Sequence, residues 1–290
     1  MAPTYNEKIY ELWADKLRFM YMLKGGAIFC VYNQAQAKIC ERVGAKAIIS
    51  VGGGHIYDND DEASEAFRMA DPGITKDIMD SVALPVFGRV RVGHEMEAKI
   101  TQHLYANGIH EYDIITTAAN EGNHILKKPY KVPFICAASD LGEALWRISE
   151  GASMIHTKGG DIESSPNIAN AIIEVNTINS QIKAAVSKFK NKDDLKAYAE
   201  EIDAPYTLLE QVARRGKLPV PLFGHGGIFE PTDAAYLMSQ NCDGLIISAN
   251  ALSSMDVQRR ALALVVATEN PKNYEMLAKI SENMDVPPID

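Results

Sequence analysis

Short apolar segments rich in β-branched residues alternate with longer segments of helical periodicity along the whole chain. Apolar runs of about four to eight residues bounded by glycine, proline or polar residues predict buried strands, whereas apolar positions spaced three and four apart predict amphipathic helices. The predicted strands cover residues 27–32, 45–51, 84–94, 111–117, 132–137, 153–159, 218–224 and 244–249. The predicted helices cover residues 5–23, 34–43, a segment that begins at 72, then 94–106, 140–151, 167–189, 192–214, 231–240, 255–268 and 272–284.

Eight strands that alternate with helices in a chain of 290 residues predict an α/β protein built as one (β/α)₈ TIM barrel. We expect a single domain over residues 1–290, with an N-terminal helical extension at 1–24 and extra helices at the C-terminal end. The alternative is a doubly wound open sheet, which tends to have fewer strands and a GxGxxG motif after the first. That motif is absent, so the pattern favours the barrel.

The predicted third strand carries two cations on one face. Its residues alternate so that Val86, Gly88, Val90 and Val92 share one face, while Phe87, Arg89, Arg91 and Gly93 share the other. A buried cation needs a partner, because removing it from water unpaired costs several kcal/mol. That partner is either an anionic ligand or a set of carboxylates. Alternatively, this is an edge strand whose arginines face water.

The predicted seventh strand runs into Gly226-Gly227 through His225. Active sites of such barrels lie at the carboxyl ends of the strands, and phosphates often bind the glycine-rich loops after the last two strands. The bare backbone N–H groups of this loop are therefore a candidate phosphate site. The same glycines are also expected in a simple tight turn.

Composition excludes several classes of function. The net charge of −9 argues against a general nucleic-acid binder and against an anionic membrane surface as a partner. No apolar run reaches the length of a membrane span, and the first 15 residues have no signal-peptide core, so we expect a cytoplasmic protein. The four widely spaced cysteines are expected to be reduced packing residues, and no Cys/His spacing predicts a metal site.

Several motifs occur in the order typical of one family. They are Met22–Ile28, Arg68–Pro72, Arg91–His94, Val132–Cys136, Asp140–Leu145, Glu150–Ile155, Thr157–Gly159 and Pro231–Ala235. Over residues 12–284 the chain closely resembles the synthase subunit of glutamine-dependent pyridoxal 5′-phosphate synthase, the Snz/PdxS family.

The resemblance implies a (β/α)₈ barrel that makes pyridoxal phosphate from a pentose 5-phosphate, a triose phosphate and ammonia. It implies hexameric rings stacked into dodecamers, and a glutaminase partner that docks near the N-terminal helix. No cofactor would be bound permanently, because pyridoxal phosphate is the product. One lysine on the third strand forms an imine, helped by an aspartate on the first strand. A second lysine, on the sixth strand, relays the intermediate and corresponds to Lys158.

The chain departs from the family pattern at the two positions that begin the chemistry. Arg89 stands at the imine-lysine position and Cys30 at the first-strand aspartate position. Arginine stays protonated and is a poor nucleophile, and a thiol between apolar neighbours is a poor proton acceptor near neutral pH. The phosphate positions correspond to Gly159, Gly226, Gly227, Ser248 and Ala249. Arg91 and His94 match supporting positions, and His94 is expected to act structurally at a helix start.

Acidic segments also replace family loops at residues 52–66 and 160–166, and most of the family's carboxylates are missing from residues 113–117. These departures favour a non-catalytic homologue that joins rings with itself or with a catalytic relative and supports vitamin B6 biosynthesis. One alternative is an active synthase or related sugar-phosphate enzyme that uses Lys158 as its imine lysine. Another is a binding protein for a phosphorylated metabolite. The histidines at 103, 110 and 124 are expected on the surface or in loops.

Overall fold

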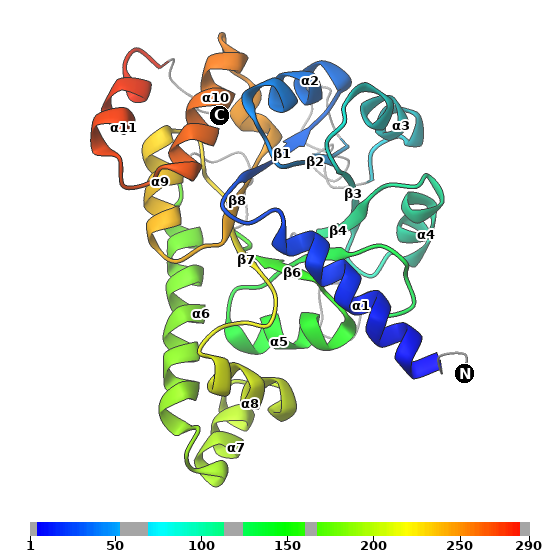
Figure 1. Ribbon diagram of the computed structural model, residues 1–290, viewed down its shortest axis with the longest axis vertical. Coiled ribbons are helices and arrows are strands. Elements are labelled where there is room, and N and C mark those ends of the chain that lie inside the picture. The colour runs from blue at the N-terminus through cyan, green and yellow to red at the C-terminus, as the bar shows by residue number, and fades with distance from the viewer. Residues whose placement is uncertain (1–4, 53–68, 113–123, 160–166, 285–290) are drawn as a thin grey trace, which may run out of the picture.

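The computed structural model describes residues 5–52, 69–112, 124–159 and 167–284. Its strands are all parallel and close into a barrel in the order β1-β2-β3-β4-β5-β6-β7-β8 (Figure 1). The strands are β1 (Ala27–Val31), β2 (Ala47–Ser50), β3 (Val86–Arg91), β4 (Gly108–Tyr112), β5 (Phe134–Ala137), β6 (Met154–His156), β7 (Leu222–His225) and β8 (Gly244–Ile247). The predicted (β/α)₈ fold is therefore confirmed.

Helices surround the barrel and extend beyond it. They are α1 (Tyr5–Tyr21), α2 (Gln34–Val43), α3 (Pro72–Ser81), α4 (Glu95–His103), α5 (Leu141–Glu150), α6 (Ala169–Lys188), α7 (Lys192–Glu201), α8 (Tyr206–Arg215), α9 (Pro231–Ser239), α10 (Val257–Glu269) and α11 (Tyr274–Ser281), with a short 3₁₀ helix at Ala249–Leu252. In Figure 1 α6, α7 and α8 project away from the barrel. None of the helices in the described ranges is long and apolar enough to cross a bilayer.

Local capping signals explain where several helices begin and end. The side chains of Asn33 and Asp71 accept hydrogen bonds from the first turns of α2 and α3. Gly44 and Gly151 take left-handed backbone conformations after α2 and α5. These boundaries were predicted correctly because each depends on residues within one helical turn.

Two predicted elements differ most from the structure. The fourth strand was expected at 111–117 but lies at Gly108–Tyr112, because Gly108 was interpreted as a helix stop, whereas it begins the strand. Residues 113–117 of that expectation lie outside the described residues, as do the acidic segments at 53–66 and 160–166. The helix expected over 192–214 is divided into α7 and α8, because Pro205 disfavours helical backbone in the residue before it.

An apolar layer fills the amino-terminal end of the barrel. Phe87, Phe223 and Met154 point inward from the beginnings of their strands and pack with Met20 at the end of α1. The ring of Phe19 also stacks on Phe87, with 6.0 Å between ring centroids. The end of α1, which crosses the barrel in Figure 1, therefore closes this opening. All four cysteines are buried and none of them forms a disulfide, as expected for packing residues.

Candidate functional site in the barrel

Arg89 lies inside the barrel and is 2 % exposed. Its guanidinium donates a hydrogen bond to Cys30 Sγ at 3.3 Å, and its Cζ lies 3.8 Å from the centroid of the Tyr112 ring. These partners come from β1 and β4. Strands β1 and β3 are not neighbours, so their side chains meet across the barrel interior. The alternative of an edge strand with solvent-facing arginines is wrong for Arg89, because a closed barrel has no edges.

Three histidines fill the space beside this arginine. His110, His156 and His225 come from β4, β6 and β7, and each is fully buried. The ring of His156 lies 4.9 Å from that of His110 and 5.1 Å from that of His225 between centroids. The expectation that His110 lies on the surface or in a loop was wrong, because the fourth strand begins earlier than predicted. A strand that starts at Gly108 alternates so that His110 and Tyr112 face inward.

Backbone carbonyls determine the tautomers of these histidines when the cluster is neutral. Nδ1 of His156 lies 2.6 Å from the Thr157 carbonyl and Nδ1 of His225 lies 2.9 Å from the Ile246 carbonyl, so both nitrogens carry a proton. Nε2 of His156 then accepts a hydrogen bond from Nε2–H of His110 at 2.9 Å. Burial, followed by the nearby His156, Arg89 and His225, holds the pKa of His110 well below its ordinary value. His110 is therefore held neutral next to a permanent guanidinium charge.

Lys158 does not join this cluster. Strand β6 ends at His156, and the Lys158 ammonium forms an ion pair with Glu143 Oε1 on α5 at 2.6 Å. The backbone N–H and hydroxyl of Ser139 donate to Oε2 of the same carboxylate, so Glu143 is itself held in place. The sequence placed Lys158 on the face of β6 that carries His156, but the described strand stops too early to keep that alternation. Glu143 was singled out only as part of a helix start, and its ion pair could not be found from sequence spacing.

The glycines after β6 and β7 allow close backbone contact. A Cβ on Gly159 would lie 2.5 Å from the Cα of Gly226, and a Cβ on Gly227 would lie 2.2 Å from the Asn167 carbonyl oxygen. All three glycines also have left-handed φ values, between 70° and 104°. Loop packing is therefore enough to require glycine at these positions, and phosphate binding by Gly159, Gly226 and Gly227 stays a prediction.

The other predicted positions lie around the same end of the barrel. Ser248 follows β8 and is 3 % exposed, and its hydroxyl has no hydrogen-bond partner among the described residues. Ala249 begins the 3₁₀ helix. Arg91 Nη2 pairs with Glu97 Oε1 at 2.8 Å, and Nδ1 of His94 accepts from the Glu97 backbone N–H at the start of α4. In this geometry Arg91 and His94 stabilise the beginning of α4.

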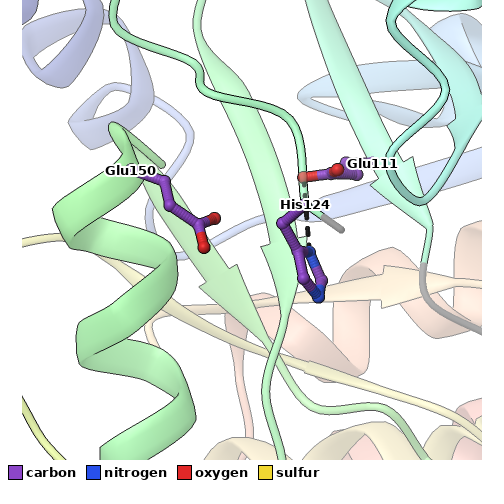
Figure 2. A group of neighbouring side chains, drawn as sticks. All are labelled: Glu111, His124 and Glu150. Atoms are coloured by element: carbon purple, nitrogen blue, oxygen red, sulfur yellow. Dashed lines mark ion pairs between the residues drawn. The ribbon is translucent and has the colours of Figure 1, made fainter. Parts of the chain in front are cut away.

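One group of potential metal ligands lies on the helix side of β4. Glu111, His124 and Glu150 have ligand atoms within 4.8 Å of one another (Figure 2). The Lys127 ammonium already contacts both carboxylates, at 2.7 Å from Glu111 Oε2 and 2.5 Å from Glu150 Oε2. A divalent cation would have to displace this ammonium, so the residues do not fit a metal ion. His124 lies in a loop, as expected, and its side chain is 4 % exposed.

Comparison with known proteins gives close relatives over nearly the whole chain. A sequence profile of the SOR/SNZ family matches residues 13–225. The chain is 40 % identical over 278 residues to pyridoxal 5′-phosphate synthase subunit PdxS of Clostridium botulinum, covering 96 % of this chain and 92 % of that protein. It is 41 % identical over 263 residues to subunit SNZ1 of Saccharomyces cerevisiae, covering 91 % and 86 %.

A solved structure shares the fold alone. Thiamine phosphate pyrophosphorylase from Pyrococcus furiosus superimposes with a TM-score of 0.50 and 12 % sequence identity, covering 87 % of this chain and all of that one.

Proposed function

The chain belongs to the SOR/SNZ family, and from that premise we propose that it is a non-catalytic subunit that supports vitamin B6 biosynthesis by assembling with synthase subunits. The curated relatives are named as subunits of pyridoxal 5′-phosphate synthase. In this proposal the chain forms family-type rings, hexamers stacked into dodecamers, with itself or with a catalytic relative. A glutaminase subunit is a further partner in the proposal, and no cofactor is bound permanently.

The observation that carries the proposal is the environment of Arg89. A guanidinium stays protonated throughout the working pH range, so it cannot attack a sugar carbonyl as a lysine amine does. Its contacts with Cys30 and Tyr112 are those of a packed cation. The surrounding side chains of His110, His156 and His225 are fully buried. They support a packed barrel interior at the place where a pentose phosphate would have to bind.

We expect no imine between the wild-type protein and ribose 5-phosphate. The measurement is intact-protein mass spectrometry after incubation with the sugar phosphate and borohydride reduction, on protein whose ring size is checked by light scattering. A second assay follows pyridoxal phosphate formation from ribose 5-phosphate, glyceraldehyde 3-phosphate and ammonia. Product formation, or a stable mass increase that disappears in Lys158→Ala, would overturn the proposal.

The second candidate is a working sugar-phosphate enzyme that uses Lys158. It is favoured by the ion pair with Glu143, because a carboxylate beside an amine can receive its proton. Under this alternative Arg89 binds an anionic group of the substrate. The Lys158→Ala comparison separates the two candidates, because only the enzyme predicts an adduct that depends on Lys158.

A further inference from the structure

A cavity of about 1260 Å³ lies outside the barrel, between α1, the C-terminal end of α5 and α8. Trp13, Leu17, Ile148 and Leu208 contribute apolar surface to its lining. Its volume is ample for a small organic molecule. None of the predicted site residues contributes to it, so it is separate from the barrel site.

Lys16 lines this cavity and is 5 % exposed. Its ammonium donates a hydrogen bond to the Tyr130 carbonyl. Among the described residues no carboxylate lies within ion-pair distance of it, in contrast to Lys127 and Lys158. Burial lowers the pKa of Lys16 to about 8, because the charged form loses hydration. A substantial fraction of this lysine is therefore a neutral, nucleophilic amine near physiological pH.

The remaining charged side chains give the cavity a positive potential. Lys128, Arg214 and Arg215 line it together with Arg18, whose charge is offset by an ion pair with Asp15. Among the side chains that the structure describes, Glu210 is the only acidic one in the lining. Cations at the rim of a partly enclosed cavity attract anionic ligands and orient their charged end.

We propose that this cavity binds a small aldehyde with an anionic group, and that Lys16 forms an imine with it. The Lys16 ammonium first releases a proton to solvent, and the amine nitrogen then adds to the carbonyl carbon. The resulting carbinolamine loses water, so that the C–O bond breaks as the C=N bond forms. No electrons are transferred, and hydrolysis reverses the reaction. Trp13 supplies a surface for an aromatic or apolar portion of the ligand.

The test uses 4-formylbenzoate as an anionic aldehyde and 4-formylbenzamide as its neutral counterpart. The wild-type protein is treated with each probe and cyanoborohydride at pH 8, and labelled lysines are located by peptide mass spectrometry. At this pH about half of an amine with a pKa of 8 is neutral, compared with about 0.4 % of an ordinary exposed lysine. We therefore expect 4-formylbenzoate to label Lys16 at least tenfold faster than the exposed Lys196 on α7.

The anionic preference is tested with Arg214→Gln combined with Arg215→Gln, both at exposed positions. In this variant 4-formylbenzoate should label Lys16 several-fold more slowly than in the wild-type protein. The rate of labelling by 4-formylbenzamide should be unchanged. Added salt should slow only the anionic probe in the wild-type protein. Equal labelling of Lys16 and Lys196 would overturn the imine site, and equal labelling of Lys16 by the two probes would overturn the anionic ligand. Neither result depends on sugar-phosphate activity. The test therefore distinguishes failure of this inference from failure of the proposed function.

Discussion

Replacing Lys127 with methionine lowers the free energy of unfolding by about 3–5 kcal/mol, the usual consequence of removing one partner of a buried ion pair. The Lys127 side chain is fully buried between the carboxylates of Glu111 and Glu150. Burial alone would lower the pKa of Lys127, but Cys136, Glu111 and Glu150 together raise it above its ordinary value, so the ammonium stays charged. Methionine fills similar volume but leaves the buried Glu111 carboxylate without its ammonium partner and leaves the half-buried Glu150 with Arg147 alone.

The effect is large because Glu111 connects several parts of the fold. Its Oε1 accepts backbone N–H groups of Gly93, after β3, and of Ile125, in the segment before β5. Glu150 lies at the end of α5 and also pairs with Arg147. Loss of the ammonium therefore weakens the attachment of the loop after β3, the segment at 124–127 and α5 to the barrel wall.

Chemical denaturation of the Lys127→Met protein measures this loss. Lys128→Met is the matched control, because its side chain is exposed and its replacement should change stability by about 0.5 kcal/mol or less. Glu150→Gln should lower the free energy of unfolding more in the wild-type protein than in the Lys127→Met protein, because the latter has already lost the ammonium that Glu150 contacts. A loss of less than about 1 kcal/mol in Lys127→Met would show that the two carboxylates do not depend on the ammonium.

The second large effect is acid destabilisation through the histidine cluster. The pKa of His110 is lower in the folded barrel than in the unfolded chain, where a histidine titrates near pH 6.5. The unfolded chain therefore binds more protons, and stability is full above about pH 6.5 and falls as the pH decreases towards the folded pKa. The slope is about 1.4 kcal/mol per pH unit for one such histidine, which amounts to about 2 kcal/mol between pH 6.5 and 5.

Two buried carboxyl groups act with the opposite sign. Burial raises the pKa values of Glu174 and Asp233, so these groups bind protons more readily in the folded protein and partly offset the histidine effect as the pH falls. Arg89 provides a fixed charge that opposes protonation of His110.

His110→Gln should flatten the pH dependence of stability below about pH 6.5. The glutamine keeps a donor for Nε2 of His156 but cannot be protonated, so the slope between pH 6.5 and 5 should fall by about 1.4 kcal/mol per unit. His103→Gln is the matched control, because His103 is exposed on α4. If His110→Gln keeps the wild-type slope, the acid sensitivity comes from other groups.

Much of the fold could be predicted from local pattern. The alternation of short apolar runs with amphipathic segments was enough for a (β/α)₈ barrel, and caps such as Asn33 and Asp71 placed helix starts to the residue. These features depend on the period of the hydrophobic residues and on hydrogen bonds within one helical turn. Both are determined by residues close together in the sequence. The resemblance of the flanking motifs also aligns Arg89 and Cys30 with the family positions of the imine lysine and its aspartate, and this assignment stays a prediction.

The partners of these residues required the closed barrel. Period-two alternation groups Arg89 with Arg91 on one strand face, yet Arg89 is buried against Cys30 and Tyr112 whereas Arg91 pairs with Glu97 on α4. The fourth strand was predicted to begin three residues later than it does, so His110 was not expected to face the barrel interior. The ion pair between Lys158 and Glu143 joins residues 15 apart along the chain at 2.6 Å. The ion pair between Lys127 and Glu111 joins residues 16 apart at 2.7 Å. Such contacts depend on strand register and on how each helix packs on the barrel, and neither is encoded in the spacing of nearby residues.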